Sequence, residues 1–516
     1  MNWFQPPRPL LPQLIERHGR WRAARPALIA GDQRLSWAEF ERATAQMANG
    51  LGALGMERGA RIAVLMDNSL ECALVLFGIL RSGCVAVPLN TSITDQAVAG
   101  MIEDAGARAI FASGRHCARI DALVSVSAPP LRIGHDAPSG AWLELMPWYG
   151  AQPETLPSVE VEPDDLCNII YSSGTTGTPK GIVHSHACRL AWATELALVL
   201  RYRSDCVTLC SLGLFSNISW VAMLATVLVG GTIVVMEAFD APAAVALIER
   251  ERITHGTFVP LQLERLLDLE SFKGSRVASL DTVMCCGSSL PIAVKREFPS
   301  RTGCQLIELY GLTEGVCTIL APEDFEAKIA SVGKPFLGTD IKVLDEQDRE
   351  VLSGVTGEIV GRGPLLMQGY YNREEASREA TWTDAHGARW LRTGDLGQLD
   401  EHGFLYIVDR KKDMILSGGQ NIYPVDIEQV MREHAEIADV AVVAARSRKW
   451  GETPVAFVVP AQGRHPERAE LLRWTNERVG RQQRIADVLF CDALPRNANG
   501  KVLKRELRSE LAGTEY

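Results

Sequence analysis

The sequence predicts an α/β fold: a large N-terminal region of two α/β lobes plus a small β-rich subdomain, followed by a small, mobile α+β C-terminal domain. Two observations support this fold class. Apolar, strand-like runs alternate with helical segments over residues 61–112, and a similar alternation recurs over residues 205–290. Strands that alternate with helices are typical of largely parallel sheets, and the repetition indicates two related lobes. The 516 residues are enough for two to four domains.

Each lobe is predicted from apolar runs and helical segments taken in chain order. In the first lobe we expect strands at 61–66, 84–88 and 109–112, with helices at 71–80 and 95–105. In the second lobe we expect strands at 206–210, 232–236 and 256–259, with helices at 217–229 and 241–251. The two lobes would together hold most of the hydrophobic core.

The pattern changes after about residue 337. Short β-like runs separated by Gly and Asp turns predict the β-rich subdomain over residues 337–409. A charged run then interrupts the apolar pattern, and new elements follow it: helices at 427–434 and 467–478, and strands at 438–443 and 455–459. We therefore expect an N-terminal domain over residues 1–409, a hinge at 410–412 and a C-terminal lid domain over residues 413–516.

The composition is that of an ordinary globular protein and disfavours several functions. The net charge of −10 argues against nucleic acid as a main partner, which usually requires a basic face. The longest apolar stretch, Val221–Met236, is broken by Gly230–Thr232 and is too short to cross a bilayer, so no integral membrane association is expected. Twelve scattered cysteines without a CxxC pair, and a start without a signal-peptide pattern, indicate a cytoplasmic protein.

Residues 171–181 read Tyr-Ser-Ser-Gly-Thr-Thr-Gly-Thr-Pro-Lys-Gly and predict an anion-binding loop. Glycines let backbone N–H groups approach an anion, hydroxyls donate hydrogen bonds to phosphate oxygens, and Lys180 adds a positive charge. A polar surface loop is the alternative, but this density of hydroxyls with a terminal lysine favours phosphate. The candidate ligands are Ser172, Ser173, Gly174, Thr175, Thr176 and Lys180.

This loop is not a Walker A motif, because Pro179 precedes Lys180 and Gly181 follows it. Apolar runs at 167–171 and 181–184 also predict strands on both sides, whereas a P-loop joins a strand to a helix. The run resembles instead the phosphate-binding signature of the AMP-forming acyl/aryl-CoA synthetases, adenylation domains and luciferases.

A second motif, Tyr310–Glu314, follows the short apolar strand 306–309. On its own this motif could be a turn, but its place after the first motif matches the family's second signature. The resemblance implies adenine stacking on Tyr310, contact of Thr313 with the α-phosphate, and Mg²⁺ at Glu314, whose oxygens suit that ion. It also implies nucleotide contacts by Gly287, Ser288 and Gly311.

Further segments match the family in order. For Asp395 an ordinary turn is the alternative, and for the charged run 409–415 it is a solvated linker. The resemblance implies that Asp395 and Arg410 bind ribose and that Lys412 is the hinge about which the C-terminal domain rotates. It also implies that Gly418 and Gly419 line a tunnel for the pantetheine arm of CoA.

Lys501 follows an Asn-Gly turn, where a solvated lysine is the alternative. The segment 495–501 resembles the family signature whose lysine enters the active site during adenylation, so Lys501 would bridge the acyl carboxylate and the α-phosphate. The resemblance covers nearly the whole chain and implies ATP, Mg²⁺ and CoA as cofactors. It implies an acid–thiol ligase that forms an acyl-adenylate, releases pyrophosphate and AMP, and makes a thioester. The candidate catalytic residues are Lys501, Thr176 and Glu314.

One run departs from the family pattern. Many acyl- and aryl-CoA ligases carry an aromatic residue followed by His near position 216, whereas here Ser216 follows Phe215. No Asp lies between 211 and 220 to pair the ammonium of an α-amino acid, so that substrate class is disfavoured. The candidate pocket residues, Phe215, Ser216, Trp220 and Gly311, suit a small carboxylic acid with an uncharged acyl or aryl tail.

Other functions remain open at this point. The nearest alternative is a stand-alone adenylation enzyme that loads an acyl group onto the phosphopantetheine of a carrier protein. A luciferase-like oxidation is less favoured, and a non-catalytic scaffold would predict damaged motifs, which are intact here. The interpretation is compatible with a homodimer.

Overall fold

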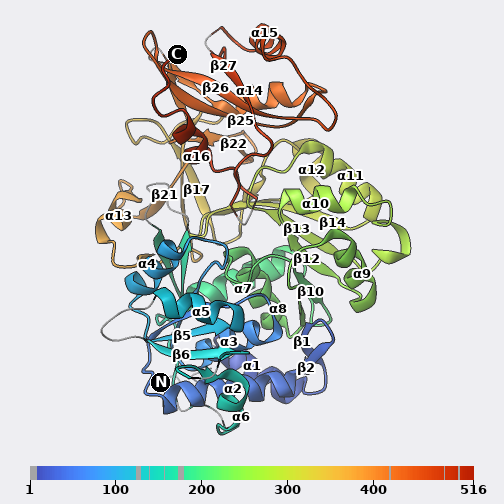
Figure 1. Cartoon of the computed structure of the whole chain (residues 1–516), viewed down its shortest axis with the longest axis vertical. Helices are drawn as coiled ribbons and strands as arrows, with labels where there is room; N and C mark the ends of the chain where they lie inside the picture. Colours follow the sequence, from blue (N-terminus) through green and yellow to red (C-terminus); the bar gives the residue numbers. More distant parts are fainter. Residues whose placement is uncertain are drawn as a thin grey trace. The chain divides into compact units, whose positions relative to one another are not determined.

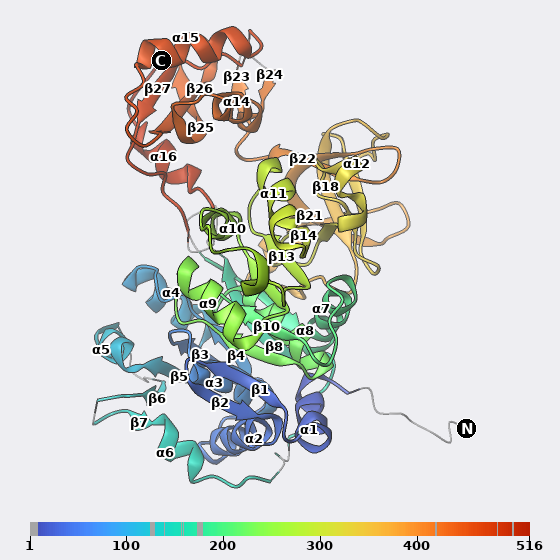
Figure 2. The same cartoon turned by 90° about the vertical axis from the view of Figure 1, so that its right-hand side faces the viewer.

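The computed structural model describes residues 9–123, 130–138, 140–155, 157, 159–172, 179–417, 420–481, 483–497 and 500–516, without the side chain of Ser172. The chain forms two compact units (Figures 1 and 2). The first unit comprises Met1–Ile329, Pro335–Asp340 and Arg362–Leu391, and the second comprises Ala330–Lys334, Ile341–Gly361 and Arg392–Tyr516.

An eight-stranded sheet, in the order β19-β9-β8-β4-β3-β5-β6-β7, forms one half of the first unit. The run from β8 to β7 is parallel, whereas β9 is antiparallel to both β8 and β19. The strands are β3 (Arg61–Leu65), β4 (Val85–Pro88), β5 (Ala109–Ser113), β6 (Leu131–His135), β7 (Leu143–Glu144), β8 (Leu166–Ser172), β9 (Lys180–Ser185) and β19 (Gly369–Tyr370).

A nine-stranded sheet, in the order β16-β15-β14-β13-β12-β10-β11-β1-β2, forms the other half. Its run from β14 to β1 is parallel. The strands are β1 (Pro26–Ala30), β2 (Gln33–Ser36), β10 (Val207–Cys210), β11 (Thr232–Val235), β12 (His255–Phe258), β13 (Thr282–Cys286), β14 (Gln305–Gly311), β15 (Cys317–Leu320) and β16 (Lys334–Pro335).

Helices cover both sheets of the first unit, and Figures 1 and 2 both show α10 and α11 beside β13 and β14. The helices are α1 (Leu11–Trp21), α2 (Trp37–Ala53), α3 (Leu70–Arg81), α4 (Asp95–Ala105), α5 (Gly114–Leu123), α6 (Leu145–Gly150), α7 (His186–Val199), α8 (Asn217–Val229), α9 (Ala241–Glu251), α10 (Pro260–Leu267), α11 (Ile292–Thr302), α12 (Phe325–Lys328) and α13 (Glu374–Glu379). Two short 3₁₀ turns are η1 (Gly274–Arg276) and η2 (Pro322–Asp324).

The two sheets share one hydrophobic core, in which α3 is central. Every residue of α3 is buried, as expected for a helix that is apolar on all sides apart from Glu71 and Arg81 near its two ends. Its N-terminus is capped by Ser69, whose hydroxyl accepts a 3.0 Å hydrogen bond from the N–H of Cys72. Phe77 of α3 belongs to the same cluster as Ile62 of β3 and Ile233 of β11, so the cluster contains strands of both sheets.

The second unit is built on an antiparallel sheet, in the order β24-β23-β26-β25, with β27 parallel to β26. Its elements are β23 (Ile415–Ser417), β24 (Gln420–Ile422), β25 (Ile437–Ser447), β26 (Gly451–Pro460), β27 (Asp487–Phe490), α14 (Pro424–Arg432), α15 (Arg468–Arg478) and α16 (Lys504–Glu510). A further sheet has the order β17-β18-β21-β20, with β22 paired to β21. Its strands are β17 (Asp340–Leu344), β18 (Gly357–Arg362), β20 (Thr381–Thr383), β21 (Arg389–Leu399) and β22 (Leu405–Arg410).

The predicted α/β class is confirmed, and the helices expected at 95–105, 217–229 and 241–251 are α4, α8 and α9 with the same bounds. The helix expected at 427–434 instead begins at Pro424, whose fixed φ suits the first turn of a helix. The pattern did not indicate α7 or the β1–β2 hairpin. Within the described residues, no helix combines the length and apolar character that crossing a bilayer would require.

Candidate active site

Four of the candidate nucleotide-binding residues of the first unit lie where parallel strands end. Gly287 and Ser288 follow β13 directly, and Tyr310 and Gly311 are the last two residues of β14. Because β13 and β14 are parallel neighbours, all four residues lie on the same side of the nine-stranded sheet, at the carboxyl ends of these strands. The carboxyl ends of parallel strands are the usual position of ligand sites in such sheets.

Gly311 is required by close packing at this edge. A Cβ atom built on Gly311 would lie 2.6 Å from the Sγ of Cys317 and 3.0 Å from the carbonyl oxygen of Val316. Contacts this short are not tolerated, so the residue after Tyr310 has no room for a side chain.

Glu314, Tyr370 and Lys180 form a contact group from three separate segments. The hydroxyl of Tyr370 donates a 3.0 Å hydrogen bond to Oε1 of Glu314. The Nζ atom of Lys180 lies 4.9 Å from the centre of the Tyr370 ring. Burial, followed by the charge of Glu314, raises the pKa of Tyr370, so its hydroxyl remains a donor at neutral pH. A carboxylate, a neutral donor and a cation thus meet beside the start of β9.

Strand pairing explains how Tyr370 reaches this group. β19 pairs with β9 in antiparallel register, with Tyr370 opposite Ile182. The N–H of Met367 also donates a 2.8 Å hydrogen bond to the carbonyl of Glu314. The segment before β19 therefore holds the end of the Tyr310–Glu314 motif next to β9.

Thr313 is tied to β9 through His184. The Nε2 atom of His184 lies 2.8 Å from the carbonyl oxygen of Thr313, and its Nδ1 lies 3.2 Å from Nη2 of Arg189. A guanidinium only donates, so Nδ1 accepts and Nε2 carries the proton. Burial, with a smaller effect of the Arg189 charge, holds the pKa of His184 well below its usual value. The imidazole is therefore a neutral link between β9 and the backbone of Thr313.

Phe215 and Ser216 lie in the connection between β10 and α8. Ser216 is the N-cap of α8, and its hydroxyl accepts a 3.3 Å hydrogen bond from the N–H of Ile218. Serine is among the preferred N-cap residues, which gives this departure from the family pattern a structural role. Trp220 follows in the first turn of α8 and is buried.

In the second unit, the two ribose-binding candidates are direct neighbours. Asp395 in β21 and Arg410 in β22 are opposite each other in an antiparallel pair, and Nε of Arg410 lies 3.0 Å from Oδ1 of Asp395. Asp395 is only 3 % exposed. Its N–H donates a 3.1 Å hydrogen bond to the hydroxyl of Thr393. The pair is therefore held by strand register as well as by charge.

The pKa of Lys501 is affected by the charges of Arg410 and Asp395. Burial, with the nearby charge of Arg410, lowers the pKa of Lys501 to about 7. Lys412 adds to this effect, whereas Asp395 and Asp413 oppose it. The ammonium group of Lys501 therefore changes charge close to neutral pH, unlike an ordinary solvated lysine.

The predicted hinge residue, Lys412, directly precedes an anchored residue, Asp413. Lys412 is exposed. Asp413 is buried, forms an ion pair with Arg508, and donates its N–H to the carbonyl of Arg410 over 2.9 Å. Its role as a hinge stays a prediction.

Several predicted site residues lie outside the described part of the chain. These are Ser173, Gly174, Thr175, Thr176, Gly418 and Gly419, together with the side chain of Ser172. The strands on both sides of the predicted phosphate-binding loop are described, and Ser172 is opposite Lys180 in the β8–β9 pair.

Sequence reasoning missed Tyr370, His184 and Arg189. Tyr370 comes from a segment between recognised motifs, and nothing local distinguishes it. For His184 and Arg189 a signal was present. Asn168 and His184 are polar residues inside apolar strand runs, and such residues are usually hydrogen-bonded when buried. Arg189 is the partner of both.

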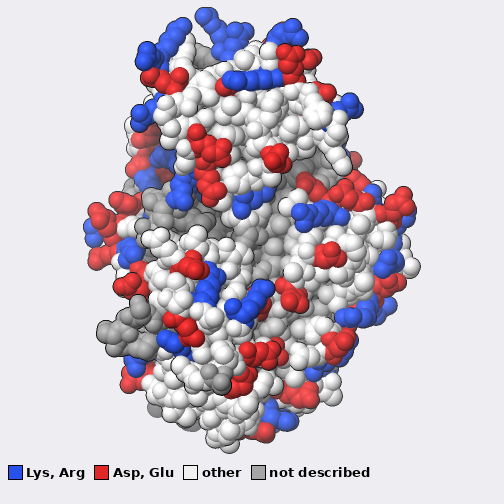
Figure 3. All heavy atoms as spheres, viewed as in Figure 1, with Lys and Arg blue, Asp and Glu red and all other residues white. Residues whose placement is uncertain are grey.

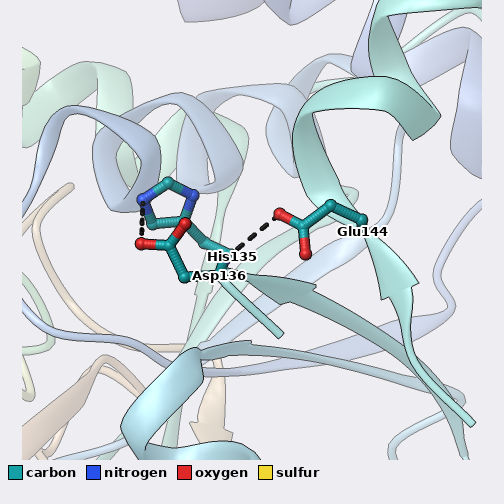
Figure 4. Close-up of side chains that lie close together, drawn as sticks. All are labelled: His135, Asp136 and Glu144. Atoms are coloured by element: carbon teal, nitrogen blue, oxygen red, sulfur yellow. Dashed lines mark hydrogen bonds and ion pairs between the residues drawn. The ribbon is translucent and has the colours of Figure 1, made fainter. Parts of the chain in front are cut away.

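A second polar cluster, at the end of β6, consists of His135, Asp136 and Glu144 (Figure 4). Its ligand atoms lie within 4.8 Å of one another. The carboxylate of Glu144, however, accepts the N–H groups of Asp136 and Ala137 over 3.1 and 3.0 Å. Figure 4 shows Glu144 directed at this backbone, so the cluster has a local structural role.

Charged side chains of both signs are interspersed over the face drawn in Figure 3. This mixture matches the modest acidic balance of the chain, whose net charge is −10.

Comparison with known families finds two matches. Residues 15–371 match the model of the AMP-binding enzymes, and residues 426–501 match the model of the AMP-binding enzyme C-terminal domain.

Curated relatives match along almost their full length. An indoleacetate–CoA ligase of Aromatoleum aromaticum is 34 % identical over 512 residues, covering 97 % of this chain and 98 % of the relative. A long-chain-fatty-acid–CoA ligase of Mycobacterium tuberculosis is 32 % identical over 489 residues, covering 94 % of each chain. Among solved structures, the o-succinylbenzoate CoA synthetase from Bacillus subtilis, in complex with its acyl-adenylate intermediate, superimposes with a TM-score of 0.84. It is 29 % identical, and the match covers 96 % of this chain and 97 % of that one.

Proposed function

This chain belongs to the family of AMP-binding enzymes and is an acid–CoA ligase that works through an acyl-adenylate, and we propose that the residues described above divide that chemistry between the two units. The observation that carries the proposal is the contact group of Lys180, Tyr370 and Glu314. These side chains offer a phosphate-binding cation, an oriented donor and a carboxylate at the edge where β14 ends.

The first half-reaction turns a poor acyl donor into a reactive one. The substrate carboxylate attacks the α-phosphorus of ATP, a carboxylate oxygen–phosphorus bond forms, and pyrophosphate leaves with its bonding electrons. Charge builds on the phosphoryl oxygens, so the protein contributes mainly positioning and electrostatic stabilisation.

The first unit supplies the nucleotide and phosphate contacts in this proposal. The ring of Tyr310 stacks on adenine, and the hydroxyl of Thr313 donates to the α-phosphate. Gly287, Ser288 and Gly311 offer backbone groups beside the base. Lys180 and the hydroxyls of 172–176 hold the phosphates, and Thr176 is the candidate catalytic hydroxyl of this loop.

The second unit supplies the ribose contacts and the catalytic lysine. The carboxylate of Asp395 accepts from the ribose hydroxyls, and Arg410, which pairs with Asp395, donates to the sugar. Lys501 bridges the acyl carboxylate and the α-phosphate when its ammonium is charged. These roles are supported by the shared register of Asp395 and Arg410 and by the charges that act on Lys501.

A magnesium ion is proposed at Glu314. Mg²⁺ prefers carboxylate, water and phosphate oxygens. The residue fits this ion, because Oε1 of Glu314 accepts a hydrogen bond from the neutral hydroxyl of Tyr370, which orients the carboxylate without adding a positive charge. When bound, the ion would neutralise part of the charge on the phosphates.

In the second half-reaction the thiol of CoA attacks the acyl carbon, a thioester forms, and AMP leaves. Lys501 has no part in this step, whereas the glycines at 418 and 419 would admit the pantetheine arm. In this proposal the small C-terminal domain presents one face in the first step and another in the second, so it must rotate between the steps. The proposed hinge is Lys412, between an N-terminal domain (1–409) and a lid (413–516).

The acid is proposed to carry an uncharged acyl or aryl tail. The pocket candidates Phe215, Ser216 and Trp220 are apolar or small, and Ser216 is engaged as a helix cap. The proposal is supported by similar ligases, which are named for long-chain fatty acids, indoleacetate and ferulate. The twelve free cysteines, eleven of them buried, support the proposed cytoplasmic location.

The test is ATP–pyrophosphate exchange with a panel of short, branched, long-chain and aromatic acids. We expect magnesium-dependent exchange with at least one acid, followed by thioester formation with free CoA. A preference for a holo carrier protein over CoA would favour the loading enzyme instead. Exchange with none of the acids would contradict the proposed site.

A further inference from the structure

Arg189 in α7 is a completely buried guanidinium at the centre of a polar cluster. Its exposed fraction is 0 %. Nε donates to Oδ1 of Asn168 and Nη1 donates to Oδ1 of Asn217, each over 2.8 Å. Nη2 donates to Nδ1 of His184 over 3.2 Å, and the guanidinium lies 5.7 Å from the centre of the Trp220 ring. All four of these partners are neutral.

A buried charge with neutral partners is costly to keep. Burial lowers the pKa of Arg189 to about 10, so the group still carries its proton at neutral pH. An apolar side chain would fill the same space without the desolvation penalty. What the arginine provides is a planar group that donates in three fixed directions at once.

Two of these directions hold the strands on either side of the phosphate loop. Asn168 in β8 and His184 in β9 are opposite each other in the antiparallel pair, so their side chains lie on one face. Further along the same pair, Ser172 is opposite Lys180, where the loop begins and ends. Arg189 therefore clamps the strand pair close to the base of the loop.

The same clamp extends to the Tyr310–Glu314 motif. His184, which accepts from Arg189 at Nδ1, donates from Nε2 to the carbonyl of Thr313 over 2.8 Å. A shift of the guanidinium would therefore be transmitted to the backbone of a proposed α-phosphate ligand.

The third direction reaches the acyl pocket. Asn217 is the first residue of α8 and directly follows Phe215 and Ser216. The other end of this segment is also held, because the N–H of Leu214 donates to Oδ1 of Asn68 over 2.8 Å. Phe215 and Ser216 thus lie between two side-chain anchors, of which Arg189–Asn217 is the one connected to the phosphate loop.

We propose that Arg189 is a positioning residue that sets the acyl-pocket segment 215–217 relative to the phosphate loop and Thr313, and thereby determines which acids are adenylated. The inference rests on the proposed function for its kinetic consequence. Its structural content, three segments joined by one guanidinium, does not depend on the substrate.

The test compares R189M, which keeps the length of the side chain but removes the donors and the charge, with R81M. Arg81 is a matched control: it is 4 % exposed and binds Glu41 and Thr44 in the α2–α3 contact, outside the proposed site. Both variants should lose stability. The readout is the ratio of kcat/KM in pyrophosphate exchange between two acids that differ in tail shape, because a smaller folded fraction cancels in this ratio.

We expect R189M to change the ratio by about tenfold, a typical effect of reshaping a hydrophobic pocket. R81M should leave it unchanged. N217A should shift the ratio in the same direction, and the double variant R189M/N217A should shift it no further than R189M. R189K keeps the positive charge but cannot donate hydrogen bonds in the three fixed directions of the guanidinium, so it should resemble R189M. Equal losses for all acids in R189M, or a wild-type ratio in R189K, would overturn the proposal.

Hydrogen–deuterium exchange without any acid separates this inference from the proposed function. R189M should accelerate exchange in peptides covering 213–220 and 310–316, and R81M should not. If the wild type supports pyrophosphate exchange with none of the acids, the proposed function fails. The hydrogen–deuterium exchange data alone then decide whether Arg189 joins these segments. Unchanged protection of both peptides in R189M would overturn it.

Discussion

The hydroxyl of Tyr370 is hydrogen-bonded to Oε1 of Glu314 over 3.0 Å, although 56 positions separate the two residues in the chain. The same ring lies 4.9 Å from Nζ of Lys180. One neutral aromatic side chain therefore contacts both the proposed metal ligand and the proposed phosphate-binding cation.

Tyr370→Phe should impair adenylation while keeping the ring contact with Lys180. A hydrogen bond to a charged group is worth about 1.5–3 kcal/mol, so kcat/KM for pyrophosphate exchange should fall roughly ten- to a hundredfold. The magnesium concentration needed for half-maximal rate should rise, because the carboxylate loses its orienting donor. Tyr149→Phe is the control, since that hydroxyl donates to Sδ of Met146 outside the site. An unchanged magnesium requirement would contradict the role given to Tyr370.

Lys501→Ala should abolish adenylate formation and spare thioester formation from a pre-made acyl-adenylate. The loss of one transition-state donor typically reduces the rate by about 10²–10³. The two half-reactions are measured separately, by pyrophosphate exchange and by thioester release. Equal losses in both steps would show that Lys501 does not act in adenylation alone.

Adenylation should weaken as the pH rises through about 7. The pKa of Lys501 is lowered to about 7, chiefly by burial, so its ammonium is charged below this pH and neutral above it. The pH profile of kcat/KM for ATP should therefore fall on its alkaline side near neutrality. Lys501→Arg keeps its charge, and its profile should lack this limb. A wild-type profile that stays flat to pH 9 would contradict the assignment.

Lys412→Pro should slow thioester formation far more than adenylation. Proline fixes φ near −65° and so freezes one of the dihedral angles that a hinge must change. Lys412→Ala removes the charge but keeps the freedom of the backbone, and it should leave both half-reactions close to wild type. If the alanine variant is impaired as much as the proline variant, the side chain rather than the backbone rotation is what matters.

Ser216→Ala should destabilise the first unit by about 1 kcal/mol, because α8 loses its N-cap. Ser216→Asn keeps a capping oxygen and should unfold close to the wild-type temperature. Thermal unfolding followed by circular dichroism compares the two variants. Equal stability of the alanine variant and the wild type would mean that the cap contributes little.

The site residues that sequence reasoning proposed occupy contiguous runs. Tyr310–Glu314 carries its chemistry within five positions, and Asp395 and Arg410 are each recognisable within a short motif. Tyr370 and Arg189 take their positions from contacts between segments that are distant in the sequence, so no local pattern predicts them. Tyr370 depends on the pairing of β19 with β9. Arg189 joins α7 to β8, β9 and α8.

The pairing of β9 with β19 has a consequence for biosynthesis. β9 lies between β8 and β19, and its partner Tyr370 leaves the ribosome long after Ile182. At roughly 5–20 residues per second, that interval lasts about 10–40 s. During this time the nascent chain has an unpaired strand edge at β9, and such edges are prone to aggregate. Completion of the proposed nucleotide site is therefore a late event in translation, and truncated chains ending before Gly369 should depend on chaperones to stay in solution.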